Sequence, residues 1–479
     1  MTSLWARFGL ARNPFFQEPL VEGDEATALD DFFIGRTADR ALCITRLTHD
    51  EQTRVVVLGA PGVGKTTLMN RILADLRAPD GMRLAWLVPE LAPINLPSAT
   101  TLPDFCIEVL RHTLDLRRQV FAIARKTGRA GRATAKQATV RARRAIAPGH
   151  DVWDVVSRVV EGALTVSPQV FGFGATTQFT PPVAGAAGWV PLTQQALAAL
   201  AAESGREILL AVNNAENLAG TLVERAQEVL VDARDIFLTP HTHWMFVGTP
   251  DFFDRVILPR RQLAGIMQHP VLLPPLGADA VRDLIARRYD ALQLPGTVFT
   301  PPVSLDTAAA LARVFVGDLR ELLRALETAV LRRAPLGTRT VSLVEAMQVV
   351  SQQQREFLRD RMHGAAWEHL RRVVVGSDTQ QFVIQRFREA DAVRILAPMT
   401  QAAVNAHKRA WIADGLVRFD GRTGASEWLS VTGEALLAML PDAVASGKTV
   451  ETLLDGRDRE ASPMPFTGVK AKAARTRRV

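Results

Sequence analysis

The sequence predicts an α/β protein in which a parallel sheet carries a phosphate-binding loop. Segment 59–67, GAPGVGKTT, lies between an apolar run and a helical stretch. Short apolar runs also alternate with helical stretches through the first half of the chain, and we expect strands at residues 55–58, 84–88, 208–212 and 244–247. Short apolar runs closed by polar, Gly or Pro residues are typical of strands that helices cover on both faces. Their alternation with helices indicates a parallel sheet.

Segment 59–67 fits the pattern G-x-x-x-x-G-K-[ST]. Its glycines allow the backbone to curl so that N–H groups face a polyphosphate, with the dipole of the next helix behind them. Lys65 is expected to reach the β- and γ-phosphates, and Thr66 to ligate Mg²⁺. The sequence therefore predicts a site for ATP or ADP with Mg²⁺. The predicted contacts are Gly59, Ala60, Pro61, Gly62, Val63, Gly64, Lys65, Thr66 and Thr67.

The strand expected at 208–212 ends in two amides, Asn213 and Asn214, where a nucleotide hydrolase of this kind carries acids. Such acids hold Mg²⁺ through water and orient or deprotonate the attacking water. Asn213 can keep a water in place but brings no charge, and Asn214 cannot take a proton. Glu216 is the alternative base. We expect binding with weak or absent hydrolysis, and the sequence leaves open whether the chain is an ATPase.

Helices replace strands in the second half of the chain. Leu319, Leu322, Leu323, Leu326 and Val330 fall at i, i+3, i+4, i+7 and i+11, which is one face of an amphipathic helix. We interpret this region as a helical lid beside the sheet.

The layout of a winged helix follows. A predicted helix at 399–417 is stopped by Gly415, and strand, turn, strand and helix come after it as VRFD, GRTGA, EWLSV and TGEALLAML. The sequence thus predicts a nucleotide-binding domain at 1–275, a lid at 276–345, a winged helix at 346–455 and a flexible basic tail at 456–479.

Length and composition agree with this organisation. The chain has 479 residues, of which 47% are hydrophobic and 22% charged, and this is typical of a globular protein of about three domains. No apolar run approaches the ~18 residues that span a bilayer, and the N-terminus does not resemble a signal peptide. We expect a cytoplasmic protein with no membrane partner. Cys43 and Cys106 are too few for a disulfide framework or zinc cluster, and we expect both in the core.

Positive charge is concentrated in two segments. Residues 116–150 hold ten Lys or Arg and no acid, and the tail after Ala461 holds five more. Since the whole chain carries +7, these fifteen charges leave −8 on the remainder. This distribution points to a polyanionic partner such as DNA, and a solvated helix with a solubilising tail is the alternative. The candidate DNA contacts in the internal segment are Arg129, Arg132, Lys136, Arg141, Arg143 and Arg144.

The predicted winged helix adds a second candidate DNA surface. In this motif the second helix enters the major groove while the wing touches the backbone. Val404 and Trp411, spaced i, i+7, are expected to face the core. Arg and Asn pair bidentately with guanine and adenine edges. The candidate contacts are Gln401, Asn405, Lys408 and Arg409 on the helix, with Arg418 and Arg422 on or beside the wing. The alternative is a winged helix that docks a protein.

In this order, the motifs resemble those of AAA+ ATPases. The phosphate loop, the strand before Asn213, a third strand ending in VGTP (247–250) and GDLRELLRAL (317–326) follow the family's arrangement. The opening FGLARNPF (8–15) and IGR (34–36) resemble the small ATPases of bacterial secretion and transposition. The C-terminal winged helix is similar to that of the origin-recognition and initiator ATPases.

The resemblance implies roles for four more residues. Thr249 stands at the sensor-1 position, which contacts the γ-phosphate or the attacking water, and Arg320 stands at sensor 2, which reaches the γ-phosphate from the lid. Arg260 and Arg261 lie where the family often places an arginine finger for the neighbouring subunit, and a surface pair is the alternative. Because the family reads Asp-Glu where this chain has two amides, its hydrolysis does not carry over.

The expected function is that of an ATP-binding AAA+ protein that engages DNA and self-associates in a nucleotide-dependent way. One alternative is a nucleotide switch of the STAND type, for instance in phage defence, whose winged helix docks a protein partner. Another is an active ATPase that remodels DNA or recruits another enzyme to it.

Overall fold

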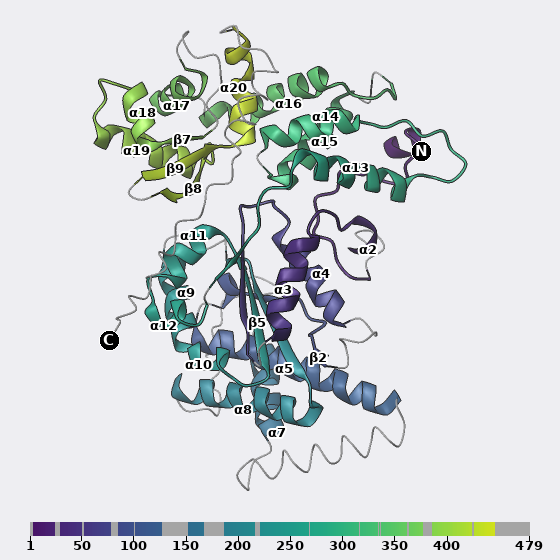
Figure 1. The fold of residues 1–479 in the computed structure, drawn as a ribbon, viewed down its shortest axis with the longest axis vertical. Coiled ribbons are helices and arrows are strands. Elements are labelled where there is room, and N and C mark those ends of the chain that lie inside the picture. Colours follow the sequence, from purple (N-terminus) through teal and green to yellow (C-terminus); the bar gives the residue numbers. More distant parts are fainter. Residues whose placement is uncertain are drawn as a thin grey trace, which may run out of the picture. The chain divides into compact units, whose positions relative to one another are not determined.

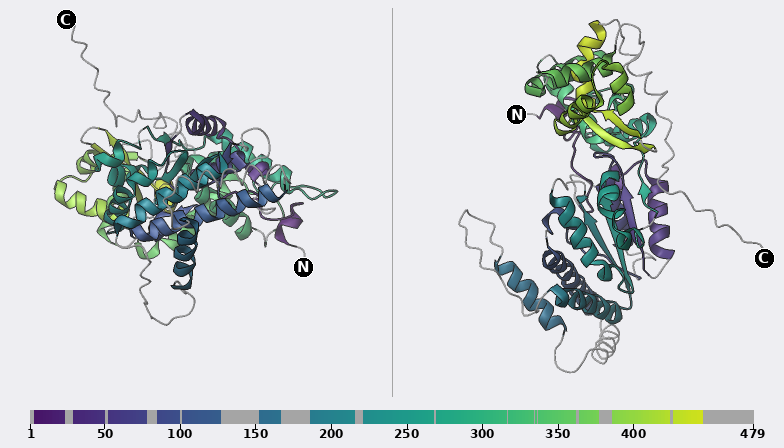
Figure 2. Two further views of the ribbon diagram at one scale, coloured as in Figure 1. Left: turned by 90° about the horizontal axis from the view of Figure 1, so that it is seen from below. Right: turned by 90° about the vertical axis from the view of Figure 1, so that its left-hand side faces the viewer.

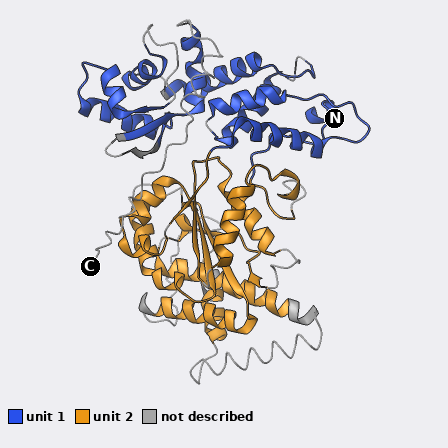
Figure 3. Ribbon diagram, viewed as in Figure 1, with its two compact units in different colours: residues 1–18, 275–479 blue, residues 19–274 orange. Residues whose placement is uncertain are grey.

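The structure, a computed structural model, divides into two compact units (Figure 3). We call residues 19–274 the sheet unit, and residues 1–18 with 275–479 the helical unit. Within them, the structure describes residues 3–23, 29–49, 52–77, 85–99, 101–126, 152–166, 186–215, 221–267, 269–315, 317–333, 335, 337–361, 364–376, 386–423 and 426–445.

The sheet unit is built on a six-stranded sheet, of which β2 and β5 are labelled in Figure 1. The strand order is β2-β4-β5-β1-β6, with β3 also paired to β4. Every registered pair of strands in this sheet is parallel, which confirms the predicted α/β class. The strands are β1 (Arg54–Leu58), β2 (Trp86–Leu87), β3 (Ile94–Asn95), β4 (Glu207–Asn213), β5 (Thr242–Gly248) and β6 (Val271–Leu272).

Helices cover both faces of this sheet (Figures 1 and 2). Val55 and Val57 of β1 pack on one face with residues of α3 and α4, while Val56 and Leu58 pack on the other with residues of α5, α7 and α8. Alternate side chains of one strand are therefore buried in separate cores, which explains why the strand reads as a continuous apolar run. The larger helices are α3 (Thr37–His49), α4 (Lys65–Arg77), α5 (Leu102–Lys126), α7 (Val152–Val166), α8 (Ala186–Ser204) and α9 (Thr221–Asp232).

Shorter elements complete the sheet unit. They are α2 (Leu29–Phe32), η1 (Leu96–Ser98), α10 (Arg234–Phe237), α11 (Pro250–Phe252), the π-helical turn Phe253–Ile257 and α12 (Arg261–Ala264). Throughout the part of the chain that the structure describes, no helix combines the length and the apolar character needed to cross a bilayer.

After residue 275 the helical unit begins with four α-helices of 10 to 15 residues, and it also contains α1 (Leu4–Arg7) and the short turn η5 (Arg359–Arg361). The four helices are α13 (Ala278–Leu292), α14 (Leu305–Val314), α15 (Leu319–Arg333) and α16 (Leu343–Phe357). The predicted apolar face of α15 is buried at Leu322, Leu323, Leu326 and Val330.

The N-terminal segment 8–15 belongs to this helical unit, although the sequence placed residues 1–275 in one domain. Arg288 of α13 is buried, and its Nη1 donates to the backbone carbonyls of Pro14 and Phe16 at 2.9 Å each. Asn13 donates from Nδ2 to Glu327 of α15 at 2.8 Å. These contacts join segments more than 270 residues apart in sequence, so no local pattern could have shown them.

The last part of the helical unit has the predicted order of helix, strand, strand and helix. These elements are α19 (Gln401–Ala413), β8 (Val417–Thr423), β9 (Ser426–Val431) and α20 (Gly433–Ala445), preceded by α17 (Ala365–Val375), β7 (Arg386–Arg388) and α18 (Glu389–Ile395). The three strands form an antiparallel sheet in the order β7-β9-β8. Val404 and Trp411 are fully buried, as their spacing predicts.

Candidate nucleotide-binding site

The phosphate loop joins β1 to α4, and its glycines meet local demands of the backbone. Gly62 and Gly64 have φ of +77° and +91°, in the left-handed region that favours glycine. At Gly59, a Cβ atom would lie 2.7 Å from Cγ2 of Val63, so a side chain there would collide with the loop itself. The glycines therefore allow a tight loop, and the loop leads directly into α4, which begins at Lys65.

Lys65 begins α4 and is only 4% exposed. Its Nζ donates to the carbonyls of Gly59 at 3.1 Å and Ala60 at 3.0 Å, so the ammonium lies across the loop. The first N–H groups of a helix have no partner within it, and the helix dipole favours an anion there. Charge-assisted bonds from an ammonium to phosphate are stronger than bonds to carbonyls, so a polyphosphate would draw Lys65 to itself.

The C-terminal ends of β1, β4 and β5 meet beside this loop. The amide of Gly59 donates to the carbonyl of Gly248, the last residue of β5, at 3.2 Å. A Cβ at Gly248 would lie 3.2 Å from Cβ of Ala215, which follows β4, so the two strand ends are closely packed. Thr249 comes next and caps α11 by accepting from the amide of Phe252 at 3.3 Å. Thr249, the sensor-1 candidate, therefore directly follows Gly248, whose carbonyl accepts from the amide of Gly59 at the start of the phosphate loop.

Asn213 and Asn214 point to different partners. Asn213 is buried, and its Nδ2 lies 3.5 Å from Oγ1 of Thr66 in α4, while its Oδ1 is buried with no hydrogen-bond partner among the described residues. Asn214 has φ of +59°, and its Nδ2 donates to Oδ1 of Asn95 in β3 at 3.2 Å. Asn95 in turn donates to Ser98 at 2.6 Å. Only Asn213 of the pair therefore contacts the helix that follows the phosphate loop.

The donor set around Thr66 fits a magnesium ion that nucleotide phosphates carry. Mg²⁺ usually takes one or two protein oxygens and completes its shell with phosphate and water. The Thr66 hydroxyl and the orphaned Oδ1 of Asn213 are oxygens of this kind. The described residues contain no group of three or more His, Cys, Asp or Glu that could hold a metal by itself. Thr66 would ligate the ion, and Asn213 would hold a water of its shell without adding charge.

Two residues near the loop, Arg36 and Asn95, are not among the contacts that the sequence predicts for the nucleotide. Arg36, part of the IGR motif, donates to the loop carbonyl of Val63 at 2.9 Å. Asn95 is the partner of Asn214, 119 residues away. For Arg36, the sequence offered only the resemblance of the IGR motif to a known family. For Asn95 there was no signal, because the two-residue strand that places it has no readable pattern.

The other predicted nucleotide residues are dispersed. Glu216 lies outside the described residues, so its candidacy as a base stays a prediction. Arg320 is exposed in the first turn of α15 in the helical unit. Arg260 and Arg261 are exposed at the start of α12 in the sheet unit, where Nη2 of Arg260 donates to Oε1 of Gln227 at 3.1 Å. Exposure suits a contact with a second molecule and equally suits a surface pair.

Three of the four candidate DNA contacts on α19 converge on one acid, Glu389 of α18. Lys408 has a side chain only 15% exposed and binds both Glu389 and Glu427, the latter at 2.9 Å. Gln401 also donates to Glu389, and the amide of Asn405 lies 2.8 and 3.1 Å from the two Glu389 oxygens. These side chains were expected together on the outer surface, but acids contributed by α18 and β9 engage them. The exposed cation of this helix in the described structure is Arg409.

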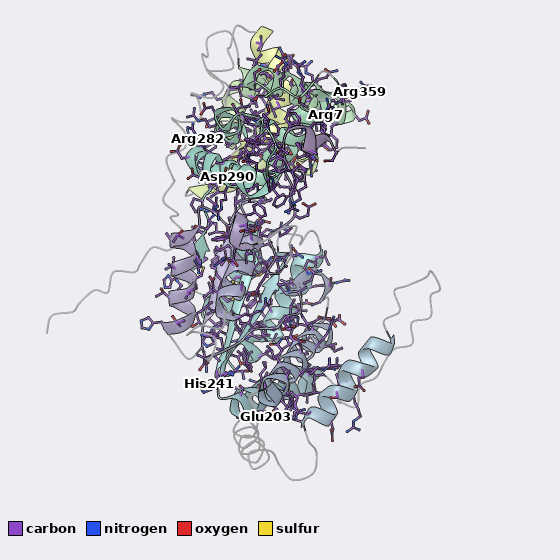
Figure 4. All side chains as sticks on the ribbon, turned by 90° about the vertical axis from the view of Figure 1, so that its right-hand side faces the viewer. Arg7, Glu203, His241, Arg282, Asp290 and Arg359 are labelled. Carbon is purple, nitrogen blue, oxygen red and sulfur yellow. The ribbon has the colours of Figure 1, made fainter. Side chains whose placement is uncertain are left out.

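The remaining DNA candidates are partly outside the described structure. Arg418 forms an ion pair with Asp318, the residue before α15, at 2.7 Å, and Arg422 lies opposite Glu427 in the hairpin of β8 and β9. Near the start of the basic segment, Arg117 of α5 binds Glu203 at 3.3 Å and lies over the Trp153 ring; Glu203 is labelled in Figure 4. The candidates Arg129, Arg132, Lys136, Arg141, Arg143 and Arg144 all lie outside the described residues.

A scan against models of protein families and a search of curated proteins found no match. A search of solved structures did find similar folds. The Orc1 protein of Aeropyrum pernix, solved in complex with DNA, has 13% identity and a TM-score of 0.43, with 87% of this chain and 95% of that chain covered. The Orc2 protein of Aeropyrum pernix, in ADPNP-ADP complexes, has 13% identity and a TM-score of 0.44, with 94% and 100% covered.

A Walker-type ATPase of Pyrococcus abyssi has 12% identity and a TM-score of 0.48, with 88% of this chain and 99% of that chain covered. All three structures have TM-scores below 0.5 and identities of 12% or 13% to this chain. Their similarity to this chain is low, so the role of each residue rests on the contacts described above.

Proposed function

We propose that this chain binds ATP as a switch and hydrolyses it slowly or not at all. The observation that carries the proposal is the contrast between the two halves of the site. The phosphate loop presents Lys65 and Thr66 at the N-terminus of α4, while the strand end beside it supplies the amides of Asn213 and Asn214. The first half is suited to binding, and the second lacks the groups that hydrolysis requires.

The chemistry of the amides supports slow turnover. A carboxamide cannot accept the proton of an attacking water, and loss of a general base typically costs ~10²–10⁴ in rate. Asn214 is further committed to Asn95 through its Nδ2. Asn213, near Thr66, brings no negative charge to the shell of a metal. An active remodelling ATPase would need a base from elsewhere, and Glu216 is the candidate that the sequence offers.

The test is calorimetric titration of the purified chain with ATP and ADP in the presence of Mg²⁺. The wild type should bind both nucleotides, and Lys65→Ala should abolish binding. Arg77→Ala is a matched control, because Arg77 ends the same helix and pairs with Glu22. Absence of nucleotide binding by the folded wild type would overturn the proposal. So would turnover at an ordinary rate, on the order of 1 s⁻¹.

We also propose that the nucleotide state controls a macromolecular contact. DNA is supported by the ten cations without an acid at residues 116–150, and self-association is compatible with the exposure of Arg260 and Arg261. Titrating labelled duplex DNA at several salt concentrations, with ATP, with ADP and without nucleotide, tests the first. Light scattering in the same three states tests the second.

The contacts of α19 argue against DNA reading by this helix, so a winged helix that docks a protein is the second candidate. Lys408, Gln401 and Asn405 are bound to Glu389, so the groups that would read base edges are already satisfied within the unit. The cost of breaking the two part-buried ion pairs of Lys408 opposes the transfer of this side chain to DNA. Arg409→Ala tests the DNA reader: a steep loss of DNA affinity supports it, and unchanged affinity contradicts DNA reading by this helix.

A further inference from the structure

Arg36 is a buried arginine that holds the phosphate loop from outside the loop. It precedes α3 and is only 5% exposed. Its Nη2 donates to the carbonyl of Val63 at 2.9 Å and to the carbonyl of Pro274 at 2.7 Å, while Nη1 pairs with Asp39 at 3.3 Å. One guanidinium therefore connects the middle of the phosphate loop to the last residue of the sheet unit.

The bond to Val63 fixes the direction of a peptide group that matters for phosphate. In a planar trans peptide, the carbonyl and the next N–H point in opposite directions. Because Arg36 holds the carbonyl of Val63, the N–H of Gly64 is turned the other way. Backbone N–H groups of such a loop, together with the N-terminus of the following helix, are the donors that bind a polyphosphate.

The same peptide could rotate if its carbonyl were released. Gly64 has φ of +91°, and glycine adopts positive and negative φ about equally readily, so its backbone resists such a rotation little. After such a rotation, the carbonyl oxygen of Val63 would face the phosphate in place of the N–H of Gly64. Val63 itself is 1% exposed, so water gives its carbonyl little compensation when Arg36 is removed.

The second bond secures the base of the loop. Pro274 follows Leu273, whose Cβ would lie 3.3 Å from a Cβ built at Gly59, so the Arg36 clamp and the packing of the loop act at the same place. Burial lowers the pKa of Arg36, and the charge and hydrogen bond of Asp39 oppose that effect. A guanidinium nevertheless stays protonated at neutral pH and adds positive charge beneath the loop.

We propose that Arg36 is a positioning residue for the nucleotide phosphates, which holds the Val63 carbonyl so that the Gly64 amide faces the β-phosphate. This inference rests on the nucleotide binding proposed above. A purely structural role would instead leave nucleotide affinity unchanged while lowering the stability of the sheet unit.

The experiment compares three variants of the full chain. Arg36→Met keeps most of the side-chain length and removes every donor, and Arg36→Lys keeps a cation that can satisfy one of the two carbonyls. Arg40→Ala is the matched control, because Arg40 lies on α3 and pairs with Asp75 of α4. Calorimetry gives the Kd of each for ATP and ADP, with and without Mg²⁺, and thermal melting without nucleotide gives its stability.

Arg36→Met should weaken ATP and ADP by the same factor, about 10- to 100-fold, because both carry the β-phosphate. The factor should not depend on Mg²⁺, and Arg36→Lys should recover part of the loss. Arg40→Ala should bind as the wild type does. If Arg36→Met proves unstable, Asp39→Asn, which removes one anchor of the guanidinium at a partly exposed position, should weaken both nucleotides several-fold.

The outcomes separate this inference from the function on which it rests. If the folded wild type binds neither ATP nor ADP, the proposed function fails and this inference falls with it. If the wild type binds but Arg36→Met and Asp39→Asn bind as tightly, the proposed function stands and the positioning role of Arg36 is overturned. A loss confined to ATP, or one that appears only with Mg²⁺, would also overturn it, since the Gly64 amide would then not serve the β-phosphate.

Discussion

Replacing Asn213 by Asp and Asn214 by Glu would return both missing groups to the strand end. The Asp would bring negative charge to within reach of Thr66, and the Glu would bring a base to the position after it. Restoring a general base is worth ~10²–10⁴ in rate, so phosphate release should rise by at least two orders of magnitude over the wild type if the remaining parts of the site are in place.

The structure also sets the cost of this double substitution. Asn214 has φ of +59°, a conformation that Asn tolerates and Glu adopts less readily, at ~1 kcal/mol. Loss of the hydrogen bond to Asn95 removes about 1 kcal/mol more. We therefore expect Asn214→Glu alone to lower the free energy of unfolding in urea by about 2 kcal/mol. The double variant, which also places a carboxylate at the buried position 213, should lose more and still bind ATP.

The assay is single-turnover hydrolysis, with binding and urea unfolding measured on the same preparations. Asn95→Ala is the control, because it frees Asn214 without adding an acid and should leave the rate unchanged. A double variant that binds ATP normally, remains folded and is no faster than the wild type would show that the two amides do not limit hydrolysis. If the wild type already hydrolyses well and Glu216→Gln stops it, Glu216 is the base and the amides of β4 are not the cause of slow turnover.

Three further results are expected. Deleting residues 127–150 should weaken DNA binding and flatten the plot of log K against log salt, since fewer counterions are released; an unchanged slope would assign this segment no DNA contact. Glu321 is half-buried beside Glu434, and burial first and the neighbouring carboxylate second raise its pKa to about 7. A raised carboxyl pKa gives stability that is complete below the unfolded value of 4.5 and is lost as pH rises toward 7, so Glu321→Gln should raise the melting temperature at pH 8 and leave it nearly unchanged at pH 4. Lys408→Ala removes the cation that pairs with Glu389 and Glu427, and it should destabilise the helical unit by ~1–3 kcal/mol in urea. If Lys408 instead contacts DNA, the substitution would lower DNA affinity and leave stability unchanged.

The sequence predicts the central strands well and misses β3 and β6, for a physical reason. β4 and β5 are buried on both faces, so each reads as an apolar run, and their observed ends differ from the predicted ends by at most two residues. β3 and β6 have only two residues each, too few for any periodicity to be read. It is nevertheless β3 that brings Asn95 to Asn214.

The candidate site shows the same division between local and long-range information. The phosphate loop is a contiguous motif, so its residues and its helix start at Lys65 are readable from spacing alone. The i, i+7 spacing on α19 likewise identifies the buried side chains. Spacing does not reveal which groups bind the polar side chains of α19. In the folded unit, Lys408 binds Glu389 and Glu427, each 19 residues away in sequence. The clamp of Arg36 on Pro274 spans 238 residues and is equally invisible to a local pattern.

The most direct test of the switch follows the bound nucleotide itself. Excess protein is mixed with ATP and Mg²⁺, unbound nucleotide is removed, and the bound nucleotide is quenched and identified as ATP or ADP over time. A rate 10²–10⁴ below an ordinary value on the order of 1 s⁻¹ implies that the bound nucleotide remains ATP for roughly 10² to 10⁴ s. Conversion of the bound nucleotide to ADP within a few seconds would contradict the account.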